Sequence, residues 1–356
     1  MKAIVLAGGE GTRLRPLTST YPKPLIPIAD KPCIDYILQS LITGGIKEII
    51  IATSYLSDKL IKTIGDGMEY DASIVYSFEE TPAGTAGAVK RVRNFCEETF
   101  VVAMGDVVAD VDIGSLVDFH KDRKAVATIA LTKVEDPSQY GATAINDRGK
   151  IVRFLEKPKK EEAFSNLVNA GIYVLEREAV EFIPENEMFD FSKNLFPKLL
   201  SKGMPLYGIP LSGMWLDIGR PMDVLKASLE VVNHNGKEIA IEGAKTKGRM
   251  MIHEGLSVDD GVTIEGPCYI GPDVRIGRGA VIKGSCFHKG VTVGAGSHIS
   301  NSLFMNNTKI GSRCTVNDSI FSVSCDIGEG AVVETSVVGE RQSVGPSKTL
   351  RGEVVQ

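Results

Sequence analysis

The sequence predicts an α/β domain with a mostly parallel sheet, followed by a parallel β-helix. Two observations support this prediction. Up to about residue 235, short β-branched apolar runs alternate with amphipathic helical patterns, which is typical of consecutive βαβ units. From Val258 onward an aliphatic residue recurs at near-sixfold spacing for more than 80 residues, which is typical of a solenoid with three short strands per coil.

Length, charge and cysteine content narrow the class of protein. A chain of 356 residues can hold two domains, which we expect at 1–236 and 257–356 with a linker over 237–256. The net charge is −5 and no apolar run reaches the roughly 20 residues that span a bilayer, so we expect neither nucleic acid nor a membrane as a partner. The six cysteines are dispersed, and because a strand begins at Lys2 we expect no signal peptide before it. Both features predict a cytoplasmic protein with reduced thiols.

The elements of the first domain follow from hydrophobic periodicity. We expect strands at 4–7, 48–53, 72–77 and 100–104, and helices at 32–43, 56–64, 86–95 and 113–121. Right-handed crossovers then make this part of the sheet parallel, with ligands at the carboxyl ends of its strands. Strands predominate over 125–175 as an antiparallel extension, and helical patterns return at 190–202 and 221–235.

A glycine-rich basic loop, within IVLAGGEGTRLRPLTSTYPKP (4–24), follows the first strand. Gly8, Gly9 and Gly11 expose backbone N–H groups to a ligand that must come close. Arg13 and Lys23 add the cations that suit a polyphosphate. A surface turn with solvated arginines is the alternative.

Neither of the two named phosphate loops fits this stretch. A dinucleotide fingerprint requires glycine where Leu14 stands, and a P-loop requires Gly-Lys-Ser/Thr where Arg13 stands. The stretch is therefore a long, proline-stiffened loop above a strand end.

Two acidic residues at strand ends are candidate metal ligands. Asp106 follows the strand 100–104 and a glycine, where a hard oxygen suits Mg²⁺ shared with substrate phosphates. A turn aspartate is the alternative for this position. Asp217 stands in MWLDIGRP beside the only tryptophan, and an acid inside a buried run needs a metal or an arginine as its partner.

Further candidates follow other predicted strands. Gly84 in PAGTAG (82–87) precedes a helix, where small residues admit a flat base or simply form a capping loop. Glu156 and Lys157 offer a carboxylate for sugar hydroxyls and an ammonium for a phosphate; a charged hairpin end is the alternative. Asn169 lies in an apolar strand, where a buried amide needs a hydrogen-bonding partner.

The second domain repeats every 17 residues. Phe287, Phe304 and Phe321 are equivalent positions of successive coils, and the inward side chains should stack into one core. His288 and His298 lie within the repeats. They are either surface residues of a coil or the base of an acyltransferase.

Taken together, these motifs resemble those of the sugar-1-phosphate nucleotidylyltransferases. The resemblance runs in order through GGEGTRLRPLT, PKP, PAGTAG, GD, FLEKP, NAGIY and WLDIGRP. GTAG after Pro82-Ala83 and IGRP after Trp215-Leu216-Asp217 are most similar to the mannose-1-phosphate guanylyltransferases. The resemblance implies a Rossmann-like nucleotidyltransferase domain followed by a left-handed β-helix.

The resemblance also implies roles for individual residues. The nucleotide would be bound by Leu6, Gly8, Gly9, Gly11, Thr12, Arg13, Lys23 and Gly84. The sugar phosphate would be bound by Gly141, Glu156, Lys157 and Asn169, and Mg²⁺ by Asp106 and Asp217. Arg13, Lys23, Asp106 and Asp217 would be the catalytic residues.

The expected reaction is an in-line displacement in which a hexose 1-phosphate attacks a nucleoside triphosphate and pyrophosphate leaves. GTP with mannose 1-phosphate is favoured; glucose 1-phosphate with UTP or dTTP is the alternative. A silent regulatory subunit and a bifunctional enzyme with an acetyltransferase β-helix remain open. We expect the β-helix to assemble a homodimer or homotetramer.

Overall fold

The computed structural model describes residues 1–54, 56–96 and 98–356. The chain forms two compact units, each considered by itself below. The first unit consists of Met1–Glu10, Pro22–Leu25 and Cys33–Asp217, and the second of Gly11–Tyr21, Ile26–Pro32 and Ile218–Gln356. In the described part of the chain, no helix is long and apolar enough to cross a bilayer.

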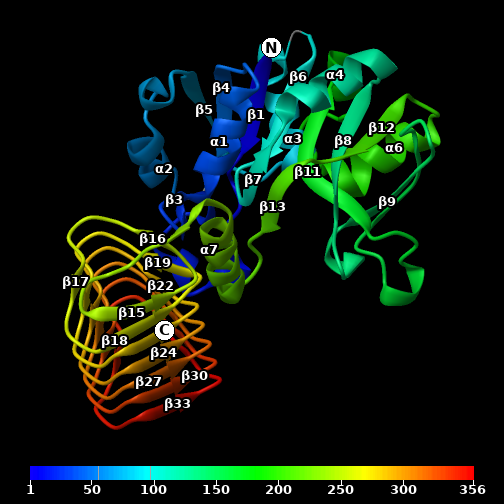
Figure 1. Cartoon of the computed structure of the whole chain (residues 1–356). Coiled ribbons are helices and arrows are strands. Elements are labelled where there is room, and N and C mark those ends of the chain that lie inside the picture. The colour runs from blue at the N-terminus through cyan, green and yellow to red at the C-terminus, as the bar shows by residue number, and fades with distance from the viewer. Residues whose placement is uncertain (55, 97) are drawn as a thin grey trace. The chain divides into compact units, whose positions relative to one another are not determined.

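A twisted mixed sheet forms the centre of the first unit (Figure 1). Its main path runs in the order β10-β9-β11-β6-β1-β4-β5, with β8 paired to β11 and β12 paired to β8. The strands are β1 (Lys2–Leu6), β4 (Glu48–Thr53), β5 (Ser73–Phe78), β6 (Phe100–Met104), β8 (Ala127–Lys133), β9 (Gly141–Ile145), β10 (Ile151–Glu156), β11 (Leu167–Leu175) and β12 (Leu206–Pro210). β1 pairs in parallel with β4 and β6, whereas β11 runs antiparallel to β6. The predicted parallel sheet with an antiparallel extension is confirmed.

Helices pack on this sheet because its central strands are apolar on both faces. The helices are α1 (Cys33–Thr43), α2 (Ser57–Ile64), α3 (Gly84–Arg91), α4 (Ile113–Arg123), α5 (Arg177–Glu181) and α6 (Phe196–Ser201). α3 packs against β1, and α4 against β8 and β12. Ile4 and Val5 of β1 are fully buried, as this arrangement requires.

The helical pattern predicted over 190–202 contains two different elements. Phe191–Leu195 forms one π-helical turn, and α6 continues from Phe196. Pro197 supplies the physical reason, because a proline in the first turn of α6 lacks the N–H that a continuous α-helix would use. Tyr173, Phe191 and Phe196 pack their rings together beneath this turn, with centroids 4.8–5.6 Å apart.

A short two-stranded ribbon that the sequence patterns did not predict completes the first unit. β7 (Val107–Val111) pairs antiparallel with β13 (Gly213–Asp217). The register places Asp217 opposite Val107, the residue that follows Asp106. The ribbon therefore brings the two predicted metal ligands to the same strand ends.

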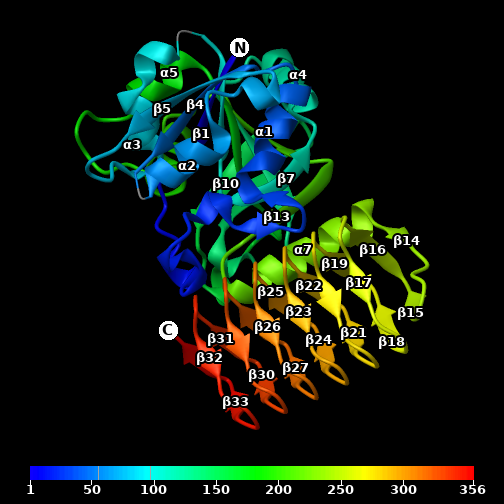
Figure 2. The same cartoon turned by 90° about the vertical axis from the view of Figure 1, so that its left-hand side faces the viewer.

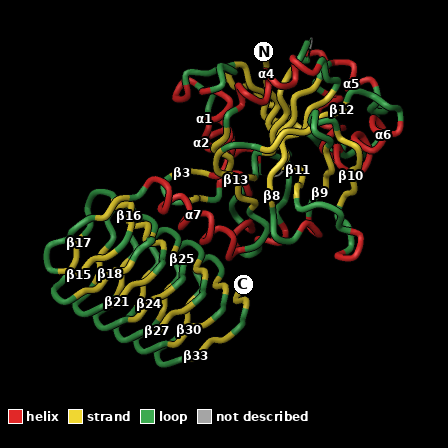
Figure 3. The backbone as a smooth tube through the Cα atoms, turned by 45° about the vertical axis from the view of Figure 1, so that its right-hand side comes forward, coloured by secondary structure: helices red, strands yellow, loops and turns green. Residues whose placement is uncertain are grey.

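The second unit is a parallel β-helix (Figures 2 and 3). Its first face consists of β14 (Lys237–Glu238), β16 (Arg249–Ile252), β19 (Cys268–Ile270), β22 (Cys286–Phe287), β25 (Leu303–Phe304), β28 (Ile320–Phe321), β31 (Val337–Val338) and β34 (Val354–Val355). Its second face consists of β15 (Ala244–Lys247), β18 (Val262–Glu265), β21 (Val281–Lys283), β24 (His298–Ser300), β27 (Thr315–Asn317), β30 (Val332–Glu334) and β33 (Thr349–Arg351). Its third face consists of β17 (Ser257–Val258), β20 (Arg275–Ile276), β23 (Thr292–Val293), β26 (Lys309–Ile310), β29 (Asp326–Ile327) and β32 (Ser343–Val344).

The interior of the coils follows the predicted period. Phe287, Phe304 and Phe321 stack with centroids 5.2 and 4.9 Å apart and nearly parallel rings. His298 is exposed on β24, whereas His288 is buried, and burial lowers its pKa to about 4. His288 is therefore neutral at pH 7 and enclosed, which does not suit a base for an external acyl acceptor.

The segment 237–256, predicted above as a linker, is part of the coils. β14 pairs antiparallel with β16, and β15 and β16 pair in parallel with the next coil. The six-residue spacing becomes regular only from Val258, so periodicity alone missed this first coil. α7 (Pro221–Asn235) packs against β16, β19, β22 and β28 of the first face (Figure 2).

Two stretches from near the amino terminus also belong to the second unit. Residues 26–32 form the small pair β2 (Pro27–Ile28) and β3 (Lys31–Pro32), and Ala29 N–H donates to Ser228 Oγ of α7. In Gly11–Tyr21, the Thr20 hydroxyl donates to the Glu340 carboxylate. Pro16 lies so close to Gly339 that a Cβ there would come 3.4 Å from the proline. The loop therefore packs against one of the last coils.

Candidate functional site

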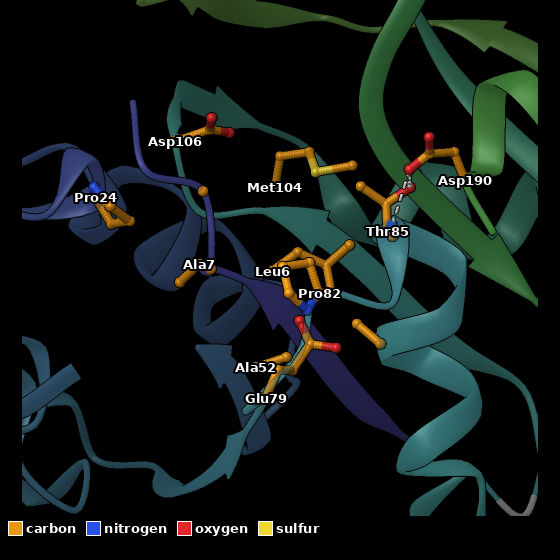
Figure 4. A pocket seen from close by; sticks show the side chains of 14 residues that line it. Leu6, Ala7, Pro24, Ala52, Glu79, Pro82, Thr85, Met104, Asp106 and Asp190 are labelled. Atoms are coloured by element: carbon orange, nitrogen blue, oxygen red, sulfur yellow. Dashed lines mark hydrogen bonds between the residues drawn. The ribbon is translucent and has the colours of Figure 1, made fainter. Parts of the chain in front are cut away.

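A cavity of about 230 Å³ lies at the carboxyl ends of β1, β4 and β6 (Figure 4). Its lining consists of Leu6, Ala7, Gly8, Gly9, Pro24, Ala52, Glu79, Pro82, Gly84, Thr85, Ala88, Met104, Asp106 and Asp190. Strand ends of a parallel sheet are where ligands of α/β proteins bind. Leu6, Gly8, Gly9, Gly84 and Asp106, all predicted from the sequence, therefore share one cavity.

Two glycines, Gly8 and Gly84, bring main chain to the lining of this cavity. Gly8 O accepts a hydrogen bond from Ser54 Oγ at 2.8 Å, and a Cβ on Gly8 would come 3.1 Å from that oxygen. Gly84 has a φ of +76°, and a Cβ there would lie 2.7 Å from the Phe189 carbonyl oxygen. Gly84 therefore requires glycine, whereas a Cβ at Gly8 would only require the Ser54 hydroxyl to shift. A flat ligand can reach the main chain beside both positions.

The amino terminus of α3 is occupied by the chain itself. Thr85 N–H donates to Asp190 Oδ1 at 3.1 Å, and the N–H groups of Ala86 and Gly87 both donate to Phe189 O at 2.9 Å. These are the amides that a helix start would otherwise offer to a phosphate. In this protein they hold the segment around residue 190 against the cavity.

Glu79 is a cavity residue for which the sequence motifs gave no role. Its side chain is only 11% exposed and lies 3.5 Å from Arg91 Nη1. Burial raises the pKa of Glu79, and Arg91 opposes that effect. The wall of the cavity therefore carries a carboxyl group, which in its ionised form accepts hydrogen bonds and donates none.

Lys23, Asp106 and Asp217 form the charged part of the first unit. Lys23 Nζ donates to Asp106 Oδ2 at 2.7 Å, and the lysine side chain is only 9% exposed. Burial opposes the charge on Lys23, but Asp106 and Asp217 together outweigh it and raise the pKa of Lys23. Two carboxylates thus share one ammonium at the end of the β7–β13 ribbon.

Cys33, at the start of α1, is the buried neighbour of this charged group. Burial, and then the negative charge of Asp106, raise the pKa of the Cys33 thiol. The thiol therefore stays protonated at neutral pH and is not a nucleophile.

Tyr140 connects Asp217 with the predicted sugar-phosphate residues. Its hydroxyl donates to Asp217 Oδ2 at 3.3 Å, and its ring packs edge-on against Trp215. Its carbonyl oxygen accepts a hydrogen bond from Lys157 N–H at 2.9 Å. Lys157 is exposed and has a φ of +47°, so a tight turn presents its ammonium to solvent.

Gly141, Glu156 and Asn169 gather on neighbouring strands β9, β10 and β11. A Cβ on Gly141 would come 3.1 Å from Glu156 Oε2, a buried oxygen for which the described residues provide no hydrogen-bond donor. Burial raises the pKa of Glu156, and Lys157 and Ser192 oppose it. Asn169 Nδ2 donates to Ser192 Oγ at 2.9 Å and to the Tyr173 hydroxyl at 3.0 Å. A buried acceptor without a donor favours a ligand that supplies a hydroxyl.

Gly11, Thr12 and Arg13 belong to the second unit, whereas the other predicted nucleotide-binding residues belong to the first. Gly11 has a φ of +62° and accepts a hydrogen bond from Thr18 Oγ1 at 2.8 Å, which closes the loop. Arg13 is exposed. Its role stays a prediction.

The charged group of the first unit fits a divalent ion shared with a substrate. Asp106 and Asp217 would supply hard oxygen ligands. In this structure Lys23 donates to Asp106, and the charge of Asp217 also acts on Lys23. Among residues 1–54, 56–96 and 98–356, no group of three or more His, Cys, Asp or Glu side chains is placed to hold a metal ion. Asp106 and Asp217 would hold Mg²⁺ as a pair, because this ion often takes one or two carboxylates and completes its shell with phosphates and water.

Sequence patterns did not point to Asp190, Ser192 or Tyr140. Each acts through a residue far away in the chain: Asp190 through Thr85, Ser192 through Asn169 and Tyr140 through Asp217. Only Tyr140 carried a usable signal, because it directly precedes the predicted Gly141.

Fold and cavity define an α/β protein with a glycine-containing pocket at its parallel strand ends and an acid, Asp106, in the pocket lining. The chain belongs to the nucleotidyl transferase family, whose profile matches residues 2–234. Residues 286–356 match the GMPPB C-terminal domain.

Individual relatives cover most of the chain. A UTP–glucose-1-phosphate uridylyltransferase from Synechocystis is 38% identical over 80% of this chain and 77% of its own. A mannose-1-phosphate guanylyltransferase from Mycobacterium tuberculosis is 34% identical over 81% of this chain and 80% of its own. A crystal structure from Bacillus anthracis, provisionally named a glucose-1-phosphate thymidylyltransferase, has a TM-score of 0.59 at 29% identity and covers 64% of this chain and 94% of its own.

Proposed function

We propose that this protein transfers GMP from GTP to mannose 1-phosphate and releases pyrophosphate. The observation that carries the reaction type is the group of Lys23, Asp106 and Asp217, of which Asp106 also lines the glycine-containing cavity. The relatives named as guanylyltransferases support the choice of substrates.

The reaction joins two anions, so charge neutralisation and positioning supply most of the rate. A phosphate oxygen of the sugar 1-phosphate attacks the α-phosphorus of the triphosphate, and the bond from that phosphorus to the pyrophosphate oxygen breaks. Lys23 and Arg13 would hold the triphosphate, and Lys157 the phosphate of the sugar. When bound, a Mg²⁺ ion held by Asp106 and Asp217 supplies further neutralisation of the phosphates.

Glu79 supports guanine as the base. Guanine presents two adjacent donors, N1–H and the exocyclic N2–H, which a carboxylate accepts together. Uracil and thymine present one N–H between two carbonyl oxygens, and both oxygens would face a negative charge. Glu79, on the wall of the cavity and held near Arg91, therefore discriminates in favour of GTP.

A matrix of GTP, ATP, UTP and dTTP against mannose, glucose and glucosamine 1-phosphates, followed by pyrophosphate release, tests the proposal. We expect GTP with mannose 1-phosphate to have the highest kcat/KM. Glu79→Gln should lower kcat/KM for GTP by about 10²-fold and narrow its advantage over UTP. Glu80→Gln, a neighbouring exposed position, is the matched control.

The uridylyltransferase relative makes UTP with glucose 1-phosphate the second candidate. This candidate would be established if the wild type preferred that pair and Glu79→Gln left the ratio of kcat/KM for GTP to kcat/KM for UTP unchanged. The proposed recognition of guanine by Glu79 would then be wrong. Absence of pyrophosphate release with every pair would instead support a regulatory subunit.

We also propose that the protein works in the cytoplasm as a homodimer or homotetramer. All six cysteines are free and buried, which suits a reducing compartment. Among the described residues, β32, β33 and β34 each pair with a strand on one side only, and open strand edges favour association. Light scattering measures the assembly directly.

A further inference from the structure

The segment Phe189–Ser192 contacts both the cavity wall and the cluster around Glu156. At one end, Phe189 and Asp190 accept the first N–H groups of α3. At the other end, Ser192 Oγ accepts a hydrogen bond from Asn169 Nδ2. Only Phe191 separates the two contacts in the chain.

We propose that Phe189–Ser192, here called the bridge, connects the start of α3 at Thr85 with the hexose-binding side chains and so sets their position. Ser192 and Thr85 are its positioning residues, one at each end. The proposal rests on the proposed function, because it assigns the hexose phosphate to the cluster of Glu156 and Asn169 and the nucleotide to the cavity.

Thr85 fastens the bridge through two kinds of bond. Its Oγ1 accepts a hydrogen bond from Phe191 N–H at 3.0 Å, and its own N–H donates to Asp190 Oδ1. The Asp190 N–H in turn donates to Asn194 Oδ1 at 2.8 Å, which closes the first turn of the π-helix. Thr85 therefore determines where the turn that carries Ser192 begins, although Thr85 itself lines the cavity.

Ser192 transmits this position to the hexose cluster. Its Oγ accepts a hydrogen bond from Asn169 Nδ2, and Ser192 also opposes the rise that burial causes in the pKa of Glu156. Asn169 is held from its other side by Tyr173 and by Gly171 N–H, so Ser192 fixes its remaining amide hydrogen. Phe191 is fully buried against Tyr173 and Phe196, which keeps the bridge from shifting as a loop would.

The test compares Ser192→Ala and Thr85→Val with the wild type and with the double variant. Steady-state KM and kcat are measured for GTP and mannose 1-phosphate, and mannose 1-phosphate binding is measured by calorimetry in the absence of nucleotide. Ser192→Ala should raise KM and Kd for the sugar phosphate about five- to tenfold and leave KM for GTP within twofold. Ser192→Thr, which keeps the hydroxyl, should restore both values.

Thr85→Val is the decisive variant. Although Thr85 faces the cavity, the bridge requires that its loss weaken sugar-phosphate binding without any nucleotide present. The double variant should then weaken it no more than the stronger single variant. Ser201→Ala, which removes an exposed hydroxyl at the end of α6, is the matched control and should bind as the wild type does.

Two results would overturn the bridge: a Thr85→Val effect confined to KM for GTP, or effects of the two variants that multiply. The calorimetry separates this failure from failure of the proposed function. If the wild type binds mannose 1-phosphate or glucose 1-phosphate but turns over no pair, the reaction is wrong and the variants still test the bridge. If it binds neither, both proposals fall.

Discussion

Asp106 shows how much one carboxylate contributes to the electrostatics of the site. It pairs with Lys23 and keeps the ammonium charged in spite of burial, and it stands one residue before the strand that pairs with Asp217. Removing it leaves Lys23 with Asp217 alone and takes one of two hard oxygen ligands from the place where we propose Mg²⁺.

We expect Asp106→Ala to lower kcat by about 10²- to 10³-fold, because preorganised charge stabilises the transition state most strongly where water is excluded. Pyrophosphate release at saturating substrates measures this effect. Asp110→Ala, an exposed position on the same strand β7, should retain normal turnover. A turnover of Asp106→Ala close to that of the wild type would remove the proposed metal role.

Among the elements, successive coils of the β-helix contact one another through phenylalanines at equivalent positions. Phe304 stacks on Phe287 on one side and on Phe321 on the other, so an interior coil depends on two interfaces. Position along the solenoid therefore decides what a substitution costs.

Phe304→Ala should destabilise the β-helix by about 3–5 kcal/mol, because the fully buried ring contacts both neighbours and leaves a cavity. Urea unfolding followed by circular dichroism measures the change. Val354→Ala in the last coil, where the side chain is 59% exposed, should change stability by less than about 0.5 kcal/mol. A loss below about 1 kcal/mol for Phe304→Ala would show that the stack contributes little.

Periodicity explains why most of the fold was predictable and part of the site was not. Alternating strands and helices, and the repeat containing Phe287, Phe304 and Phe321, are local patterns. The pairing of β7 with β13 and the contact of Ser192 with Asn169 depend on strand register and on a π-helical turn, which leave no periodic signal. The glycine loop marked the cavity, whereas the partners that hold its walls came only from tertiary packing.

At the level of the complete chain, the loop Gly11–Tyr21 depends on a late coil for its packing. Leu14 and Leu17 are buried in the second unit, and Thr20 bonds to Glu340. Exposed Arg13 stands in this loop, so its susceptibility to trypsin reports how firmly the loop is held.

In Glu340→Ala we expect cleavage after Arg13 to accelerate about fivefold, as the loss of roughly 1 kcal/mol from one hydrogen bond predicts. Timed digestion with mass spectrometry of the fragments measures this rate. Glu353→Ala is the control, because Glu353 is an exposed glutamate that is not among the loop contacts described above. Its rate of cleavage after Arg13 should equal that of the wild type. Equal cleavage of Glu340→Ala and wild type would mean that the loop is held without this contact.

The hydrogen bond between Thr20 and Glu340 spans 320 residues of sequence, which has a consequence for synthesis. The ribosome makes Thr20 320 residues before it makes Glu340, and the coil against which the loop packs follows the loop by a similar distance in the chain. The loop can therefore reach its final packing only after the coil that contains Glu340 has been translated. Truncated products of interrupted translation would carry an unfinished nucleotide loop, however well their sheet had folded.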